Sequence, residues 1–588
     1  MPNLNQMVST INKNMSMIYN RGVQDGVTLK ESGEYDRQVL AVLSAVNWRT
    51  PLEFGAYADG VSDDTAAIQA CLDASDYVYI PKGTYTVDVC VSLFPKSNQT
   101  IVMDPQTVIT CLKVDDEDSK LNYSMVRLVN VSNVLITGGC LVGDRFIRDH
   151  VNKYNRGHNI AISGGSNITI RNVELHSSFN DGICIGAWVE TDASGNYVKD
   201  DHDQYIRHNC KNLKIQDCHI HDFGRSGISN CGCDGFELID CHIHSWTGCV
   251  TPGSIIDFEP DYTINSNNFI TGLYGHDTST GVVVTTRNTD FTMTNSRVDC
   301  FQTQIEGDTL VKDCICENKW GCKQPGTFKI VNCASTGFLL CRSTGNVIAT
   351  DCICVGDEAR LQSPVILLEG IVKDDTYEED EGTENTELLV DASQARLSCY
   401  NCVFYSKKSN EGDRSSIFWS EVYSCKEIYF DKCVFNFRNN ITNSWRAENI
   451  KFNACTFNID GDTDAINCRL CNFLGRGYIP YEYYGDPMYQ FIFTNNLIRI
   501  GNAAKNIRLF NVQARVSEIY GNTISVDDSR AIAAAATSVD SPLYIYCGLN
   551  NVSRSLTVAN NIAPMYSCFV DVGDNLVARL HNNFVAAG

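Results

Sequence analysis

The chain has 588 residues, a hydrophobic fraction of 43 % and a formal net charge of −23 at pH 7. The apolar fraction is high enough for a large buried core, which excludes an intrinsically disordered protein. The acidic excess argues against nucleic acid or an anionic membrane as partner, because phosphate contacts need a basic surface.

The first 50 residues differ in pattern from the rest. Residues 7–19 and 35–46 predict short helices without strand alternation, so residues 1–50 are expected to be an N-terminal helical segment. The opening MPNLNQMVSTINKN has no basic stretch followed by an apolar core, so no signal peptide is expected. No apolar run approaches the ~20 residues of a membrane helix, so no membrane insertion is expected.

Residues 54–87, FGAYADGVSDDTAAIQACLDASDYVYIPKGTYTV, predict a helix followed by strands. Ser62 or Asp63 is the expected N-cap, with acidic residues in the first turn where the helix dipole favours them. The tract 77–80 then predicts a strand that ends at a Pro-Lys-Gly turn. Apolar residues form a helical stripe at Ala67, Ile68, Cys71 and Leu72.

This segment resembles the entry of the pectate-lyase-like superfamily, especially the bacteriophage tailspikes that cut surface polysaccharide. The resemblance implies an all-β fold, a right-handed, single-stranded parallel β-helix (a solenoid) with a capping helix. It also implies a virion tail protein, assembled in the host cytoplasm, that forms a homotrimer. Residues 1–50 would then attach to tail or baseplate proteins or form a trimer neck; the simpler alternative is an N-terminal cap without a partner.

One eight-residue pattern recurs along the remaining chain: apolar, any, apolar, any, Asn or Asp, Cys or Asn, any, apolar. Steps of roughly 20 to 30 residues with strand periodicity predict a solenoid with one coil per repeat. We therefore expect residues 51–130 to be the β-helix entry and residues 131–588 its body. The pattern occupies residues 213–220, 236–243, 310–317, 328–335, 347–354, 428–435, 450–457, 491–498 and 556–563.

Cysteine, of which the chain has 28, recurs at one position of this repeat. A fixed position in each coil predicts an internal stack of buried, reduced thiols rather than a disulfide framework. Reduced thiols fit folding in a reducing cytosol.

Histidines concentrate where the repeat reads Asp-Cys-His-Ile-His. Strand alternation directs the cysteine and isoleucine inward and the histidines outward. This predicts one outward file of Glu174, His219 and His242, and a second of His176, His221 and His244. Such a surface can line a sugar groove or bind a divalent metal, since imidazole suits Zn, Cu or Ni; the alternative is plain stacking on a solvated face. We expect sugar contact, and neither a metal nor another cofactor.

Between these coils lies a surplus segment, residues 187–209, whose polar composition predicts an excursion loop. Its aromatic residues Trp188, Tyr197 and Tyr205 are candidates for stacking on sugar, as is Trp246 nearby in the coil. The alternative is that they anchor the loop. Two acidic runs, 374–387 and 460–464, are expected to be solvated loops rather than calcium sites.

A second outward cluster follows on the next strand of the same coils. The segments 179–186, 223–230 and 251–260 align on Ile183, Ile228 and Ile256 as inward residues. Alternation then directs Asp257 and Glu259 outward with Phe258 buried between them. Arg225 is expected beside Asn180 on the neighbouring coil, close to Asp181.

The stretch GRSGIS followed by TPGSIIDFEP resembles an element of tailspike-type β-helix proteins, but departs from it at Ile255, where glycine is usual. The segment Asn180-Asp181-Gly182 is distantly similar to the polygalacturonase pattern. Arg225-Ser226 stands where that family has histidine, so its mechanism cannot be carried over intact.

Glycoside hydrolysis needs one protonated and one ionised carboxyl. The predicted catalytic residues are Asp257, Glu259, Asp181 and Arg225, with Arg225 orienting substrate or serving as the base of a β-elimination. The predicted function is binding and cleavage of a bacterial surface polysaccharide, a capsule or an O-antigen. Hydrolysis is the expected reaction, and β-elimination by a polysaccharide lyase is the alternative. Because outward acids are also ordinary on a solvated β-helix, a non-catalytic glycan-binding adhesin stays an alternative. Asp222 and Asp234 are reserve acids.

Overall fold

The computed structural model describes residue 48 onward, with gaps. The predicted helices in residues 7–46 and the acidic runs 374–387 and 460–464 lie outside the described residues. The described ranges are 48–112, 122–147, 156–248, 250–251, 253–260, 262–285, 287–305, 307–322, 326–335, 338–341, 345–355, 366–368, 396–405, 418–420, 425–437, 447–459, 468–473, 488–501, 507–512, 514–526, 545–549, 555–564, 567–572, 578–581 and 584–586.

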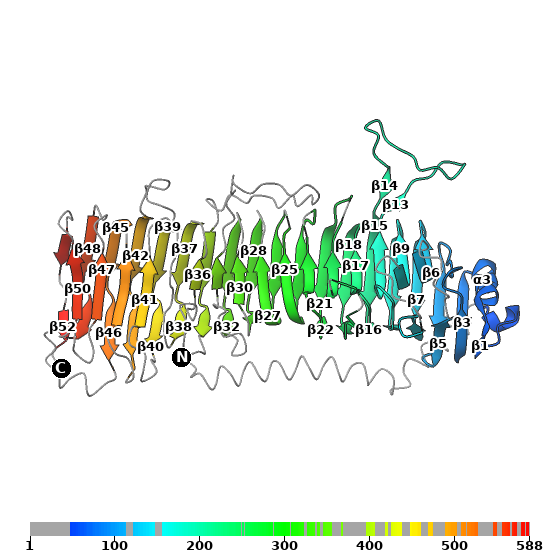
Figure 1. The fold of residues 1–588 in the computed structure, drawn as a ribbon, viewed down its shortest axis with the longest axis horizontal. Helices are drawn as coiled ribbons and strands as arrows, with labels where there is room; N and C mark the ends of the chain where they lie inside the picture. Colours follow the sequence, from blue (N-terminus) through cyan, green and yellow to red (C-terminus); the bar gives the residue numbers. More distant parts are fainter. Residues whose placement is uncertain are drawn as a thin grey trace. The chain divides into compact units, whose positions relative to one another are not determined.

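The chain forms two compact units, Met1–Gly307 with Asp313–Ile315, and Asp308–Lys312 with Cys316–Gly588. In unit 1 each complete coil contributes three strands, and every strand pairs in parallel with its equivalents on the coils before and after (Figure 1). This is the predicted parallel β-helix. No helix among the described residues is long and apolar enough to cross a membrane.

The three faces of unit 1 are named here by their order along a coil. The first face contains β2 Tyr77–Ile80, β4 Thr100–Met103, β7 Ser132–Thr137, β10 Ser166–Arg171, β15 Cys210–Gln216, β18 Cys233–Ile239, β21 Ser266–Thr271 and β24 Phe291–Thr294. The second contains β1 Asp59–Asp63, β3 Gly83–Val87, β5 Thr107–Cys111, β8 Cys140–Val142, β11 Glu174–His176, β16 His219–His221, β19 His242–His244 and β22 Tyr274–His276. The third contains β6 Asn122–Val129, β9 Arg156–Ser163, β12 Ile183–Gly186, β17 Ser226–Asn230, β20 Ser254–Phe258 and β23 Gly281–Val284, and β25 Arg297–Thr303 pairs with both β22 and β23.

The recurring Asn/Asp-Cys pair forms the corner between the first and second faces. Asp217 and Asp240 adopt φ of 52° and 49°, a left-handed conformation that Asn and Asp tolerate better than other non-glycine residues. The chain therefore turns sharply between β15 and β16 and between β18 and β19. The repeat thus records a backbone requirement as well as a packing pattern.

The cysteine after each corner points into the coil, as predicted. Cys218 and Cys241 are buried free thiols, and their Sγ atoms lie 3.3 Å from the carbonyl oxygens of Gln216 and Ile239. Burial raises the pKa of the Cys241 thiol well above its ordinary value, so this sulfur stays protonated and donates to the backbone. The cysteine position is therefore a core position of the β-helix.

The entry helix α3 Thr65–Ala74 follows a short 3₁₀ helix, η1 Pro51–Phe54. Its stripe of Ile68, Cys71 and Leu72 is buried as predicted. The predicted N-cap is wrong: Ser62 and Asp63 belong to β1, and the N-cap is Asp64. Asp64 is buried, and its carboxylate accepts the backbone N–H groups of Tyr57 and Ala58 rather than capping the helix by its side chain.

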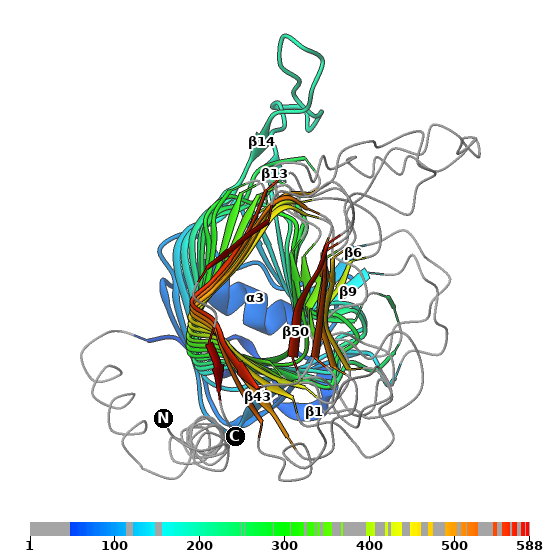
Figure 2. The same ribbon diagram turned by 90° about the vertical axis from the view of Figure 1, so that its left-hand side faces the viewer.

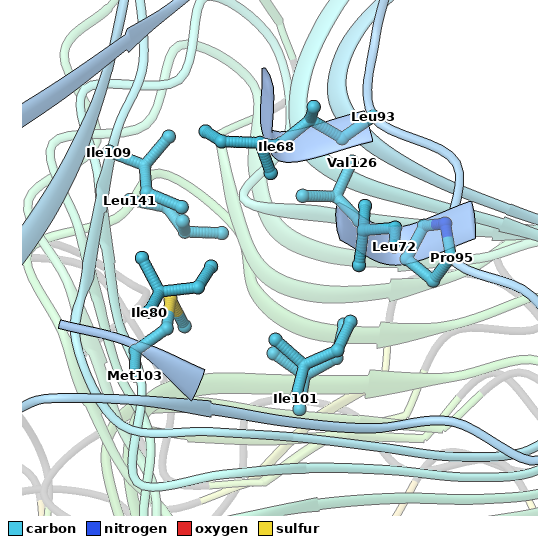
Figure 3. A pocket seen from close by; sticks show the side chains of 11 residues that line it. Ile68, Leu72, Ile80, Leu93, Pro95, Ile101, Met103, Ile109, Val126 and Leu141 are labelled. Carbon is cyan, nitrogen blue, oxygen red and sulfur yellow. The ribbon is translucent and has the colours of Figure 1, made fainter. Parts of the chain in front are cut away.

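Helix α3 lies across the interior of the ring of strands when unit 1 is viewed along the coils (Figure 2). Ile68 and Leu72 contact the apolar residues of the first coils around a cavity of about 20 Å³ (Figure 3). The lining is entirely apolar, which is typical of imperfect packing rather than of a polar ligand site. The helix therefore closes the coil interior, as the entry segment predicted.

Unit 2 repeats the same parallel coils. Its first-face strands are β26 Thr309–Lys312, β28 Thr327–Val331, β31 Asn346–Thr350, β34 Arg396–Tyr400, β37 Cys425–Asp431, β39 Ala447–Asn453, β42 Met488–Thr494, β45 Ala514–Tyr520, β48 Ser555–Ala559 and β51 Ala578–His581. The following strands are β29 Ala334–Ser335, β32 Ile353–Val355, β35 Val403–Tyr405, β38 Val434–Phe437, β40 Thr456–Ile459, β43 Leu497–Ile500, β46 Thr523–Val526, β49 Ile562–Pro564 and β52 Phe584–Ala586. The remaining strands are β27 Ile315–Cys322, β30 Phe338–Cys341, β33 Ile366–Leu368, β36 Phe418–Ser420, β41 Cys468–Phe473, β44 Ile507–Val512, β47 Ile545–Leu549 and β50 Ser567–Val572.

In the later coils of unit 2, asparagine replaces cysteine after the corner. Asn496, Asn522 and Asn561 are buried. The Asn496 side-chain amide donates to Asn522 Oδ1 at 3.0 Å, and the Asn522 amide donates to Asn561 Oδ1 at 2.9 Å. These amides form an internal ladder at the repeat position that cysteine occupies in the earlier coils.

Candidate active site

The third face of unit 1 holds the predicted acids. Ile183, Ile228 and Ile256 pair with one another across β12, β17 and β20 and are fully buried. Phe258 is also fully buried, where its ring packs edge-on against Phe236. The predicted facing is therefore confirmed, and the residues on either side of Phe258 point away from the coil interior.

Arg225 contacts all three predicted acids. We call the four residues Arg225, Asp181, Asp257 and Glu259 the Arg225 cluster. Arg225 Nη2 donates to Asp257 Oδ2 at 3.3 Å and to Glu259 Oε2 at 3.2 Å. Its Nη1 lies 3.7 Å from Asp181 Oδ2, and its backbone N–H donates to the Asn180 carbonyl at 2.8 Å. The structure thus brings together all four predicted catalytic residues, which come from three successive coils.

Asp257 lies in β20 and Glu259 follows the end of that strand, and the two side chains differ sharply in solvent exposure. The Asp257 side chain is 4 % exposed, whereas the Glu259 side chain is 47 % exposed. Burial, followed by the charge of Glu259, raises the pKa of Asp257 to about 7, although Arg225 acts in the opposite direction. Asp257 is therefore a carboxyl that can carry a proton near neutral pH, and its neighbour is open to a ligand.

Arg225 is poorly suited to act as a base. Burial disfavours its charge, but the carboxylates of Asp181, Asp257 and Glu259 favour it more, so its pKa lies above the ordinary value. An arginine that stays protonated can position carboxylates or bind an anionic group, but it cannot accept a proton. The geometry thus favours the orienting role over the β-elimination role.

Sequence reasoning missed His158, which lies buried on β9 against Asp181. His158 Nδ1 is 3.3 Å from Asp181 Oδ2, and the His158 side chain also hydrogen-bonds Cys184. Burial opposes protonation of the ring, but Cys184 and Asp181 outweigh it and raise the pKa of His158 to about 10. Asp181 is therefore held between a histidine and Arg225. Residues 156–163 do not match the repeat, so no sequence signal placed His158 here.

The second face carries the predicted histidine files. Register pairs Glu174 with His219 and His219 with His242; in the second file it pairs His176 with His221 and His221 with His244. Both files continue for one more coil, to Tyr274 and His276. We call these eight side chains the histidine face. His276 was missed because Gly272-Leu273 replaces the Asp-Cys pair there, although the spacing of Tyr274 and His276 matches.

The rings of the histidine face are in mutual contact. His244 and His276 stack with centroids 4.9 Å apart, and His219 Nε2 lies 2.8 Å from His244 Nε2. Burial and the neighbouring histidines lower the pKa of His242 to about 2 and that of His244 to about 4. By contrast, Glu174 and Asp222 outweigh burial at His221 and raise its pKa.

The surplus segment 187–209 forms a hairpin that stands away from the coils of unit 1 (Figure 1). Its base is the antiparallel pair β13 Trp188–Val189 and β14 Arg207–His208, and the rings of Trp188 and His208 stack at 5.4 Å. The Arg207 guanidinium lies 4.2 Å from the ring centroid of Tyr262, three residues after Glu259. The hairpin base thus contacts the chain shortly after Glu259.

The predicted aromatic contacts divide into anchored and exposed residues. Trp246 donates its indole N–H to the carbonyls of Gly224 and Val250, at 2.9 and 3.1 Å, which favours the anchoring alternative. Tyr205 and Tyr197 are 42 % and 64 % exposed on the hairpin and lie edge to face. Contact between sugar and Trp188 or Tyr205 stays a prediction.

A family model described as "Rhamnogalacturonase A/epimerase, pectate lyase-like" matches residues 48–306. Residues 48–306 are therefore similar to the pectate-lyase-like family, and we call them the pectate-lyase-like segment. The Arg225 cluster and the histidine face both lie within the pectate-lyase-like segment.

The curated relatives of this chain include the following three. Uncharacterized protein YclG of Bacillus subtilis (strain 168) is 26 % identical over 203 residues, 31 % of this chain and 32 % of that protein. Pre-neck appendage protein of Bacillus phage phi29 is 25 % identical over 238 residues, 38 % of this chain and 27 % of that protein. Mannuronan C5-epimerase AlgE5 of Azotobacter vinelandii is 32 % identical over 190 residues, 30 % of this chain and 17 % of that enzyme. The alignments thus span a third or less of each relative's own length.

Proposed function

We propose that this protein binds a bacterial surface polysaccharide and hydrolyses its glycosidic bonds at the Arg225 cluster. One observation carries the proposal: Arg225 bridges a buried carboxyl, Asp257, and an exposed carboxyl, Glu259, on the outer surface of a β-helix. Hydrolysis of a glycoside needs such a pair, one protonated and one ionised. The pectate-lyase-like match and the similarity to a mannuronan epimerase support a polysaccharide as substrate.

In this proposal Asp257 is the general acid. Its buried position favours the protonated form near pH 7, from which it donates a proton to the glycosidic oxygen as the bond to the leaving sugar breaks. Glu259, whose side chain is exposed, supplies the second carboxyl, as base or nucleophile. Arg225 positions both carboxyls, and Asp181 with His158 fixes the guanidinium from the other side.

We further propose that the protein is part of a phage tail. The similarity to the pre-neck appendage protein of Bacillus phage phi29 supports a virion location. Attachment to tail proteins through residues 1–50 and assembly as a homotrimer belong to the same proposal and rest on the tailspike resemblance alone.

The test compares three variants on a surface polysaccharide that the purified protein binds. Asp257→Asn and Glu259→Gln should each lower the rate of release of reducing ends by ~10²-fold or more while glycan binding is retained. Glu237→Gln is the matched control, because Glu237 is an outward acid of the first face paired with Lys214 at 2.8 Å. Wild-type rates in the first two variants would move the active site elsewhere.

The alternative function is a glycan-binding adhesin on the same fold. It predicts binding without release of reducing ends by the wild-type protein. If that is the result, the Arg225 cluster is an ion-pair network in a binding groove and the hydrolase proposal fails.

A further inference from the structure

The histidine face places several potential metal-ligating side chains close to one another. Four coils in succession present outward pairs on β11, β16, β19 and β22. Ligand atoms of His219, His242 and His244 all lie within 4.8 Å of one another, and so do those of Glu174, His219 and His221. Adjacent coils fix these positions through their backbone ladders, so the convergence is built into the strand register.

The closest ring contacts join nitrogen to nitrogen. His219 Nε2 lies 2.8 Å from His244 Nε2, and His242 Nε2 lies 2.9 Å from His276 Nε2. A tetrahedral zinc with bonds of ~2.0–2.1 Å would hold two imidazole nitrogens about 3.3 Å apart. For the His219–His244 pair, that distance is about half an ångström longer than the present one. Without an ion, each contact needs one ring to donate N–H to the other.

Imidazole binds a metal through an unprotonated ring nitrogen, and the other ring nitrogen is then free to donate a hydrogen bond. A neighbouring side chain can orient one of the ligating rings, because His244 Nδ1 hydrogen-bonds Ser245 Oγ at 2.7 Å. Such partners of the second ring nitrogen are usual around metal-binding histidines.

We propose that His219, His242 and His244 bind a divalent transition-metal ion, zinc above all, on the outer surface of the second face. The donor set is three imidazole nitrogens, which suits zinc, copper or nickel and disfavours calcium or magnesium. The ion would join β16 to β19 through side chains, in addition to their backbone hydrogen bonds. The site is separate from the Arg225 cluster and does not depend on hydrolysis.

The test uses the full chain freed of metal with a chelator and titrated with ZnCl₂ by calorimetry. We expect about one zinc per chain, and a visible absorption spectrum of four-coordinate cobalt when CoCl₂ replaces ZnCl₂. His219→Gln and His244→Gln should each weaken zinc binding at least tenfold. His202→Gln, in the exposed hairpin, is the matched control and should bind zinc as the wild type does.

Three results would overturn the proposal: no zinc binding by the wild type, equal binding by the His219→Gln/His244→Gln double variant, or loss of binding in His202→Gln alone. Circular dichroism of each metal-free variant shows whether it is folded. If His244→Gln does not fold, His219→Gln supplies the same test. Turnover on polysaccharide is not part of the readout, so failure here leaves the hydrolase proposal standing.

Discussion

Asp257 and Glu259 are two residues apart, yet the fold gives them different surroundings. Asp257 lies in the outward file of β20 opposite Ser229 and is covered by the Arg225 guanidinium, whereas Glu259 follows the end of the strand and is open to solvent. A carboxyl whose pKa is raised by burial is the usual candidate for the acid of such a pair, and here that carboxyl is Asp257. The division of roles proposed here rests on that contrast.

The first residue-level prediction concerns the pH dependence of turnover. A general acid acts only while protonated, and the pKa of Asp257 is raised to about 7. The value of kcat/KM should therefore fall as pH rises above about 7, approaching tenfold per pH unit. A profile measured from pH 5 to 9 checks this. A kcat/KM that rises through pH 7 would instead indicate that the group with this pKa acts as a base.

The second concerns Arg225, whose charge lowers the pKa of Asp257 against the effects of burial and Glu259. Arg225→Met removes that charge, so the descending limb of the profile should move to higher pH by ~1 unit. Arg225→Lys keeps a charge but loses the planar fork, and should shift the limb less. If Arg225→Met leaves the limb in place, the limb does not report Asp257.

At the scale of strands and corners, the fold depends on residues that tolerate a left-handed backbone. Asn172 between β10 and β11 has φ of 51°, and Asp217 and Asp240 occupy the same corner in the next two coils. A β-carbon in this conformation crowds the following carbonyl oxygen, at a cost of roughly 1–2 kcal/mol for an ordinary residue. The recurring Asn/Asp of the repeat is explained by this cost.

Asn172 offers a direct test of the corner. Asn172→Ala should lower stability by ~1 kcal/mol through backbone strain, whereas Asn172→Gly should be close to neutral because glycine adopts positive φ freely. The melting temperatures of the two variants, measured side by side, check the order. An alanine variant as stable as the glycine variant would show that the corner is not strained.

Much of this architecture could be predicted from the sequence, because side-chain facing in a strand is a local property of period two. Alternation placed Phe258 inside and Asp257 outside, and it set the two histidine files in register. Burial and contact could not be predicted in this way. The contact of Arg225 with Asp257 joins side chains of two successive coils. The contact of His158 with Asp181 joins two residues that are 23 positions apart and share no sequence pattern.

The helix start was mispredicted for a similar reason. Asp63 and Asp64 both precede α3, and local capping preferences did not distinguish them. The buried Asp64 carboxylate is needed by backbone N–H groups of the preceding loop, at Tyr57 and Ala58. Asp63 instead accepts the Thr65 N–H at 2.9 Å. A contact outside the helix therefore decided which residue became the N-cap.

At the scale of the whole molecule, a chain of net charge −23 presents its candidate chemistry within residues 48–306, the pectate-lyase-like segment. That segment holds both the Arg225 cluster and the histidine face, on the third and second faces of the same coils. An acidic protein is expected to bind a neutral polysaccharide directly. It is expected to bind an acidic polysaccharide through Arg225 or through a bridging cation. The polysaccharide that is cleaved should therefore reveal which of these applies.

The most direct measurement is to incubate the purified protein with a panel of bacterial capsular and O-antigen polysaccharides and to analyse the products. The proposed hydrolysis predicts new reducing ends on at least one glycan, without the ultraviolet absorbance of unsaturated uronate. Appearance of that chromophore would contradict hydrolysis and indicate elimination. Binding of a glycan with neither product would contradict catalysis at the Arg225 cluster altogether.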